Sequence, residues 1–133
     1  MFFLKMTKDE ITKLLKTGDT LLSEDDISRL AGVLSGNRNS PGAFIRQRRT
    51  LLLIHSYLYY HKNVSVVSDQ VWQGWANDLA ILQYTFPQET TQNFYDDAFI
   101  DWTGATGFDL PVDEWIMTQA IKEFRQYTGQ VLE

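Results

Sequence analysis

The chain has 133 residues and no cysteine, which excludes disulfide bonds and thiolate metal sites. It also lacks a long apolar run: a membrane-spanning helix needs about 18 apolar residues, and the run Leu51–Ile54 is far shorter than that. The first six residues contain no charged leader, long apolar stretch or small-residue cleavage site, so we expect no signal peptide. These absences fit a protein of the reducing cytoplasm that does not enter a membrane.

Lysine and arginine are missing from the whole span between Asn63 and Ala120. The carboxylates in that span are Asp69, Asp78, Glu89, Asp96, Asp97, Asp101, Asp109, Asp113 and Glu114. An acidic surface repels phosphate, so direct nucleic-acid binding is not expected there. A protein partner with a basic surface is the expected alternative, whereas a solvated face that aids solubility explains any single carboxylate.

Hydrophobic spacing predicts an all-α protein: a compact bundle of four to five helices with one ordered aromatic and acidic loop segment. Residues 1–36 are expected to form an N-terminal helical hairpin, and residues 43–133 the main helical domain, the two making one compact unit. The capping and stop signals of the hairpin are Thr7, Gly18, Ser23 and Gly36. Residues 36–42 are the best linker candidate.

Two long helices are predicted in the middle of the chain. The first runs from about Ala43 to about His61 and the second begins after Ser68, whose side chain caps it. The second helix stops before Phe86-Pro87, because the residue before proline disfavours helix. Residues 88–112 are expected to form a short helix and then a loop pinned by aromatic side chains. Asp113 or a neighbour would cap a last helix ending at Gly129.

The segment from Arg46 to Pro87, about a third of the chain, resembles the N-terminal Ia domain of the NAD-dependent DNA ligases. That domain has His-x-x-x-Tyr-His at the end of one helix and Asp-x-x-Tyr-Asp at the start of the next. His55, Tyr59 and Asp69 match this pattern. The resemblance implies a remnant of the site that closes over the nicotinamide mononucleotide half of NAD. Its residues would be His55, Tyr59, Tyr60, Asp69, Trp72 and Gln73.

Three departures from the family fall on that same site. Tyr60 stands in place of the second His, Trp72 in place of the Tyr, and Gln73 in place of the second Asp. Trp72 keeps a stacking surface but has no hydroxyl. The Lys-x-Asp-Gly motif that carries the nucleophilic lysine of the ligases is absent too. We therefore expect no enzymatic activity and no cofactor beyond weakly bound NMN or NAD.

The stretch from Asp101 to Phe108 resembles the Asp-x-x-Gly-x-x-Gly-Phe motif of small ligase-like bacteriophage proteins. It favours a non-catalytic interaction protein of phage or mobile-element origin, acting in the bacterial cytoplasm. Such a protein would occupy a host protein with a basic surface, for example a CRISPR effector nuclease. The candidate partner-binding residues are Asp96, Asp97, Asp101, Trp102 and Asp109. Alternatives are a small NMN- or NAD-binding module and an accessory to a separate ligase adenylation domain.

Several residues keep two interpretations at this point. The aromatic residues of the central helices serve a core as readily as a stacking cage. Arg46, Arg48 and Arg49 are expected on wetter helix faces, although in the NAD-binding alternative Arg46 or Arg49 would reach phosphate. Asp101–Asp109 is expected to be a turn-rich structural loop rather than a calcium loop. His55 and His61 are six residues apart, a spacing that does not favour a shared metal.

Overall fold

The chain is described by a computed structural model that places residues 8–15, 24–34, 40–104 and 107–132. Within these ranges the structure is all-α, as predicted, with no strand and with two short 3₁₀ helices beside the α-helices. None of the placed helices is long and apolar enough to cross a membrane. The elements are α1 Lys8–Leu15, α2 Glu24–Leu34, α3 Pro41–Lys62, α4 Asp69–Thr85, η2 Pro87–Glu89, η3 Asp96–Phe99 and α5 Glu114–Thr128.

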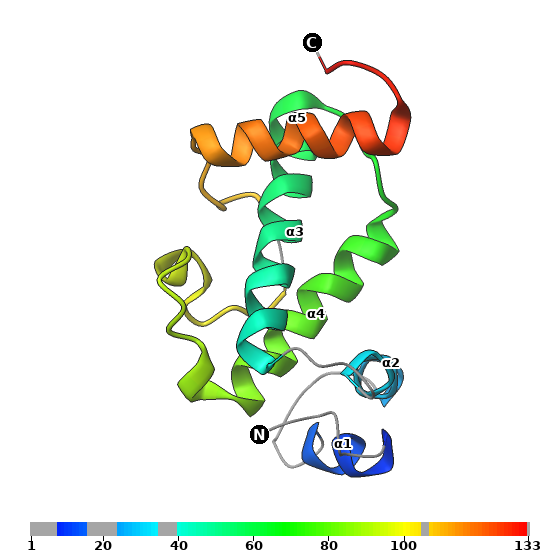
Figure 1. Cartoon of the computed structure of the whole chain (residues 1–133), viewed down its shortest axis with the longest axis vertical. Helices are drawn as coiled ribbons and strands as arrows, with labels where there is room; N and C mark the ends of the chain where they lie inside the picture. Colours follow the sequence, from blue (N-terminus) through cyan, green and yellow to red (C-terminus); the bar gives the residue numbers. More distant parts are fainter. Residues whose placement is uncertain (1–7, 16–23, 35–39, 105–106, 133) are drawn as a thin grey trace.

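Helix α3 is the central element of the molecule (Figure 1). Its 22 residues begin at Pro41, directly after Ser40, whose side chain accepts a hydrogen bond from the backbone N–H of Ala43. Proline suits this first position because its fixed φ fits a helix and its missing N–H is not needed there. The helix thus starts two residues earlier than Ala43, and the predicted linker was wrong over Pro41 and Gly42, which are helical.

Helix α4 begins and ends where the sequence predicted. The hydroxyl of Ser68 accepts a hydrogen bond from the backbone N–H of Val71, and the helix ends at Thr85, before Phe86-Pro87. Asp113 caps α5 in the same way, through a 2.8 Å bond from the N–H of Ile116, and Gly129 ends it with a positive φ. Both predicted caps are therefore confirmed.

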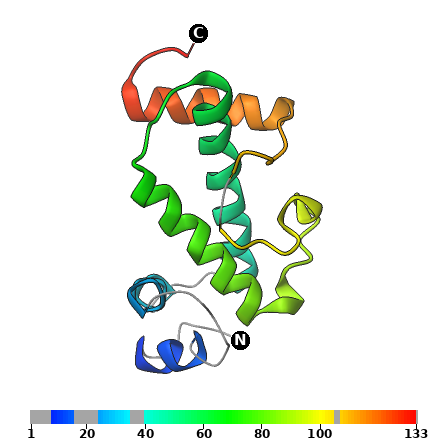
Figure 2. The same cartoon turned by 180° about the vertical axis from the view of Figure 1, so that it is seen from behind.

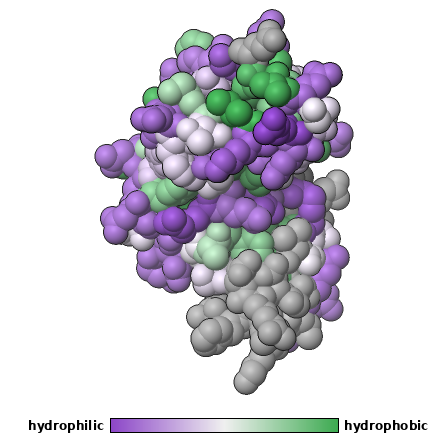
Figure 3. All heavy atoms as spheres, turned by 45° about the horizontal axis from the view of Figure 1, so that its top comes forward, coloured by the Kyte–Doolittle hydropathy of each residue, from purple (hydrophilic) through white to green (hydrophobic). Residues whose placement is uncertain are grey.

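Each of the five described α-helices contributes to one buried apolar cluster. Figure 2 shows the arrangement of these helices from behind. Helix α4 packs along α3, α5 crosses one end of α3, and α1 and α2 lie near the other end, beside α4. The most deeply buried apolar residues include Ile11, Leu30, Leu34, Ile45, Leu52, Leu58, Leu79, Leu82, Ile116 and Ala120. Figure 3 turns the α5 end toward the viewer and shows apolar patches between larger hydrophilic areas.

The N-terminal hairpin contacts the main domain through α4. Arg29 of α2 lies 2.8 Å from Oδ1 of the buried Asp78, and Arg48 of α3 donates from Nε to Oδ2 of the same carboxylate at 2.9 Å. One carboxylate therefore joins three helices. The predicted capping and stop residues of the hairpin, Thr7, Gly18, Ser23 and Gly36, lie outside the described residues.

The prediction that Arg48 and Arg49 face solvent was wrong. They are only 8% and 1% exposed. Helix α3 is covered by other elements on several sides, so even its charged residues are enclosed. Burial of a guanidinium is tolerated here because each one meets a carboxylate. Arg46 does remain exposed, and its guanidinium lies 4.6 Å from the centre of the Phe94 ring.

Arg49 holds the segment after α4 against the bundle. Its Nη1 donates to the Phe94 carbonyl at 3.0 Å and to Asp96 Oδ1 at 2.6 Å. Its Nη2 donates to the Thr90 carbonyl at 2.9 Å, and both Nη2 and Nε donate to Gln83 Oε1, at 2.8 and 3.2 Å. All five N–H groups of the guanidinium are thereby used. The irregular segment is folded around a buried cation.

Asp96 completes this arrangement. Its carboxylate also accepts hydrogen bonds from the backbone N–H groups of Gln92 and Asn93. Burial raises the pKa of Asp96, but these backbone bonds and the bond from Arg49 together outweigh burial, so the pKa lies below its ordinary value of 3.8. The carboxylate stays charged opposite the buried guanidinium.

We predict that Arg49→Lys destabilises the protein by about 3 kcal/mol, because lysine has three N–H donors on a single atom and cannot reach all these acceptors. The free energy of unfolding from urea titrations measures the loss. The exposed Arg125 of α5 provides the matched control. Arg125→Lys should change stability by less than about 0.5 kcal/mol. Equal stability of the two variants would contradict the structural role of Arg49.

Candidate functional site

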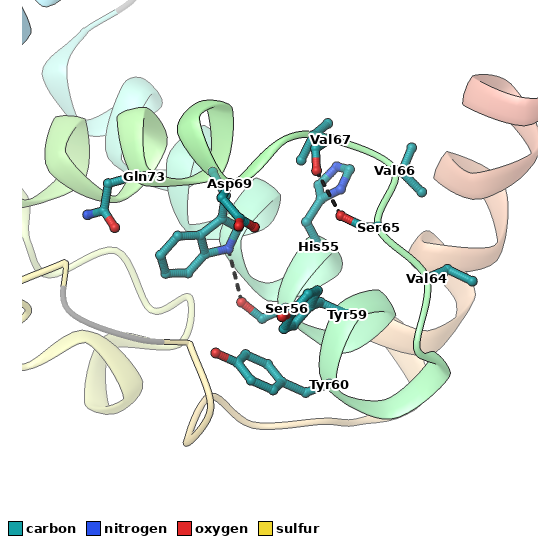
Figure 4. Close-up of a pocket in the computed structure, with 11 residues that line it drawn as sticks. His55, Ser56, Tyr59, Tyr60, Val64, Ser65, Val66, Val67, Asp69 and Gln73 are labelled. Carbon is teal, nitrogen blue, oxygen red and sulfur yellow. Dashed lines mark hydrogen bonds between the residues drawn. The ribbon is translucent and has the colours of Figure 1, made fainter.

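A pocket of about 190 Å³ lies where α3 ends and α4 begins (Figure 4). Its walls come from the last turns of α3, the connector over residues 63–68, and the first turns of α4. The residues that line it are His55, Ser56, Tyr59, Tyr60, Val64, Ser65, Val66, Val67, Asp69, Trp72 and Gln73. A cavity of about 150 Å³ accepts benzene, so this volume fits one flat ring rather than a whole dinucleotide.

The six residues singled out on the two central helices all line this one pocket: His55, Tyr59, Tyr60, Asp69, Trp72 and Gln73. They meet because α3 ends at Asn63 with a left-handed φ of 55° and Ser68 restarts the chain as α4. Sequence reasoning did not include Ser56 or the valines of the connector. The position of Ser56 next to His55, and the apolar character of the connector, were the available signals.

Trp72 is fixed beside the pocket by polar and steric contacts. Its indole Nε1 donates to Ser56 Oγ at 3.2 Å, across the junction of the two helices. Gly107 lies so close on another side that a Cβ there would overlap Ser56 Oγ and come within 2.9 Å of the Trp72 ring. Only glycine fits this approach without a shift of the neighbouring side chains. The aromatic and acidic loop thus buttresses the indole.

The same loop also holds the first turns of α4 through hydrogen bonds. Gln73 Nε2 donates to the Gly104 carbonyl at 2.8 Å and to Asn77 Oδ1 at 2.9 Å. The Trp102 indole donates to the Ala76 carbonyl at 3.0 Å. The expected loop with aromatic anchors is observed, although its local helices are 3₁₀ turns and residues 105–106 lie outside the described part.

Of the described residues that line the pocket, His55 is the one whose buried polar side-chain atoms have no hydrogen-bond partner among the described residues. It is 4% exposed, and neither Nδ1 nor Nε2 has a hydrogen-bond partner within the part of the chain that the structure describes. Its ring centre lies 5.1 Å from that of Trp75 and 5.9 Å from that of Tyr127. Burial among these rings lowers the pKa of His55 to about 4. At neutral pH it is a neutral imidazole with one donor and one acceptor.

Exposed aromatic side chains form one edge of the pocket. Tyr59 and Tyr60 stand perpendicular to each other with ring centres 4.9 Å apart, and Phe108 stands perpendicular to Tyr60 at 5.4 Å. All three are exposed, so of the two interpretations left open for the aromatic residues, the core does not apply to Tyr59 and Tyr60. Tyr59 and Tyr60 lie on the last turns of α3, whereas Phe108 follows Gly107 in the loop. Of the three rings, the two tyrosines line the pocket.

The proposed partner-binding residues divide into two groups. Asp97, Asp101 and Asp109 are exposed. Asp96 is committed to Arg49 and the loop backbone, and Trp102 to the Ala76 carbonyl. No group of three or more His, Cys, Asp or Glu side chains suited to a metal occurs among the described residues.

Comparisons of this chain with protein-family models, curated proteins and solved structures find no match. The resemblance to the ligase Ia domain therefore stays a prediction.

We predict that the stability of the protein falls as the pH drops from 6.5 towards 4, because the unfolded chain binds a proton at His55 that the folded protein excludes. With respect to His55, the free energy of unfolding is highest above pH 6.5, and it decreases by about 3 kcal/mol as the pH falls towards 4. Urea unfolding at several pH values measures it. Asp96 contributes only below this window, since its pKa lies under 3.8.

His55→Phe should remove this part of the pH dependence while it keeps a ring in the core. His61 is exposed, and His61→Gln is the matched control that should retain the full dependence. A wild-type pH profile in His55→Phe would show that the imidazole is not held neutral by burial.

Proposed function

We propose that the protein is a non-catalytic binding module that takes the nicotinamide ring of nicotinamide mononucleotide into the pocket between α3 and α4. The observation that carries the proposal is that the six residues His55, Tyr59, Tyr60, Asp69, Trp72 and Gln73 line one pocket whose volume of about 190 Å³ suits a single ring. The carboxamide of nicotinamide has both a donor and an acceptor, so it can pair with a polar side chain of the lining such as Asp69.

Aromatic side chains supply the apolar part of this site. Tyr59, Tyr60 and Trp72 line the pocket together with the valines of the connector. Binding pockets commonly combine such apolar walls with a few polar groups that orient the ligand. Here the polar groups at the start of α4 are Asp69 and Gln73. The set supports recognition of a flat ring with a polar substituent.

The arginines do not contribute to this site. Arg49 donates all five of its N–H groups to acceptors on α4 and on the segment after it. Arg46 donates to the Gln92 carbonyl at 3.2 Å. Neither lines the pocket. The expectation that they reach the ligand's phosphate is therefore dropped, and in our proposal the phosphate points into solvent.

We predict that nicotinamide mononucleotide binds with a dissociation constant below about 1 mM, and that Tyr59→Ala raises it about tenfold by removing one aromatic wall. Isothermal titration calorimetry measures both values. Tyr84 provides a matched control because it lies on α4 outside the pocket and is 54% exposed, against 52% for Tyr59. Tyr84→Ala should bind like the natural protein. Absence of binding to the natural protein would eliminate this function.

A second candidate function is binding of a basic protein partner, such as the host nuclease expected from the phage-like motif. The observation that favours it is the exposure of Asp97, Asp101 and Asp109 in a span without lysine or arginine. Exposed Ile100 and Phe108 lie beside two of these carboxylates in the chain. Acidic rims around apolar contacts are typical of surfaces that recognise basic proteins.

Charge reversal tests this second function. We predict that the double variant Asp97→Lys, Asp101→Lys loses a bacterial protein that the natural chain retains on an affinity column at low salt. Tyr59→Ala should retain the same protein if the acidic loop, rather than the pocket, makes the contact. Retention by the charge-reversed variant would exclude the acidic loop as the interface.

A further inference from the structure

We propose that two copies of this chain pair through helix α5, whose exposed side binds the same side of a second copy in antiparallel orientation. The surface consists of Glu114, Met117, Ile121 and Arg125, and we call it the α5 stripe. None of these four residues lines the pocket between α3 and α4, so the α5 stripe is separate from the proposed ligand site.

The residues of the α5 stripe share one side of the helix. Their successive spacings of three, four and four positions place the side chains one above another on the helix surface. A different row of α5, formed by Ile116, Ala120 and Phe124, is buried against the rest of the protein. Helix α5 therefore carries one row that packs on the core and a second row that does not.

The middle of the α5 stripe is apolar and exposed. Met117 is 37% exposed and Ile121 is 49% exposed, although both are large hydrophobic side chains. Helix α5 lies at the outer edge of the molecule in both ribbon views, where a second molecule can approach it (Figures 1 and 2). A single exposed apolar residue needs no explanation, but two neighbours on one helix side form a small contact surface.

The two ends of the α5 stripe carry opposite charges. Glu114 lies in the first turn of α5 and Arg125 in the last turn, and both are exposed. Neither side chain forms an ion pair or a hydrogen bond with another residue that the structure describes. A matching surface needs a cation opposite Glu114 and a carboxylate opposite Arg125. A second α5 stripe provides both when it runs in the opposite direction.

The positions of the charges fit a two-fold axis. Because a helix rises about 1.5 Å per residue, Glu114 lies about 7.5 Å before the midpoint between Met117 and Ile121, and Arg125 about 9 Å after it. A two-fold axis through this midpoint brings Glu114 of one copy to nearly the same level as Arg125 of the second copy. Met117 then lies opposite Ile121, and each contact occurs twice by symmetry.

A parallel arrangement of the two helices is unfavourable. It would place Glu114 opposite Glu114 and Arg125 opposite Arg125, and like charges across an interface repel each other. The helix dipoles would also point in the same direction, whereas they are opposed in the antiparallel pair. The charge pattern therefore selects the antiparallel arrangement. Since each copy contributes one helix, the interface is small and the association is weak.

Sedimentation equilibrium measures the association. We expect a dissociation constant on the order of 100 µM for the natural protein. Glu114→Arg and Arg125→Glu should each raise it at least about tenfold, because either change creates two like-charge contacts in the dimer. Asp97→Arg is the matched control, since it makes the same kind of charge change at an exposed position outside α5 and should leave the constant unchanged.

The apolar part of the α5 stripe is tested separately. Ile121→Ser should also raise the dissociation constant about tenfold by removing apolar contacts on both copies. Ile100 is 66% exposed and lies outside α5, so Ile100→Ser is its control and should associate like the natural protein. Circular dichroism checks that every variant remains folded. Equal effects of the two serine substitutions would overturn the assignment of α5 as the interface.

Mixing the two charge variants tests the antiparallel geometry. The Glu114→Arg protein then presents two cations and the Arg125→Glu protein two carboxylates, so an equimolar mixture should form dimers at least about tenfold more tightly than either variant alone. The double variant Glu114→Arg, Arg125→Glu should associate like the natural protein. A natural protein that stays monomeric at about 1 mM would overturn the proposal. A mixture that associates no better than its separate components would overturn it too.

Discussion

The buried guanidinium of Arg49 is the interaction on which the rest of the structure depends. It lies on α3, reaches Gln83 on α4, and holds the backbone on both sides of η3 together with Asp96. Without it, the segment between α4 and α5 would have few regular hydrogen bonds of its own. The hydrogen bonds from this one cation therefore order the irregular segment, as backbone hydrogen bonds order a helix or a strand.

The geometry of the pocket follows from that anchoring. Once the segment after α4 is held, its continuation brings Gly104 to Gln73 and Gly107 to the Trp72–Ser56 pair. The indole is then confined between the two helices and the loop. Preorganised walls reduce the ordering cost of binding, so a ligand can use more of its contact energy for affinity. The loop therefore supports the pocket although its described residues do not line it.

Much of the fold could be predicted from local signals, since Ser68, Asp113 and Gly129 act through their own backbone neighbourhood. The convergence of His55, Tyr59 and Trp72 on one pocket could also be predicted, because a short connector joins their helices. The burial of Arg48 and Arg49 could not. It depends on acceptors about 30 or more positions away, and hydrophobic spacing carries no information about such partners.

The lining of the pocket comes from a single stretch, 55–73, whereas its outer support comes from 102–107. The two parts are separate in the sequence. A short deletion near Gly107 would leave every lining side chain in place and still alter the cavity, because the Trp72 indole would lose its neighbour on that side. A comparison of the stretch 55–73 alone between distant proteins would overestimate how many of them retain the cavity.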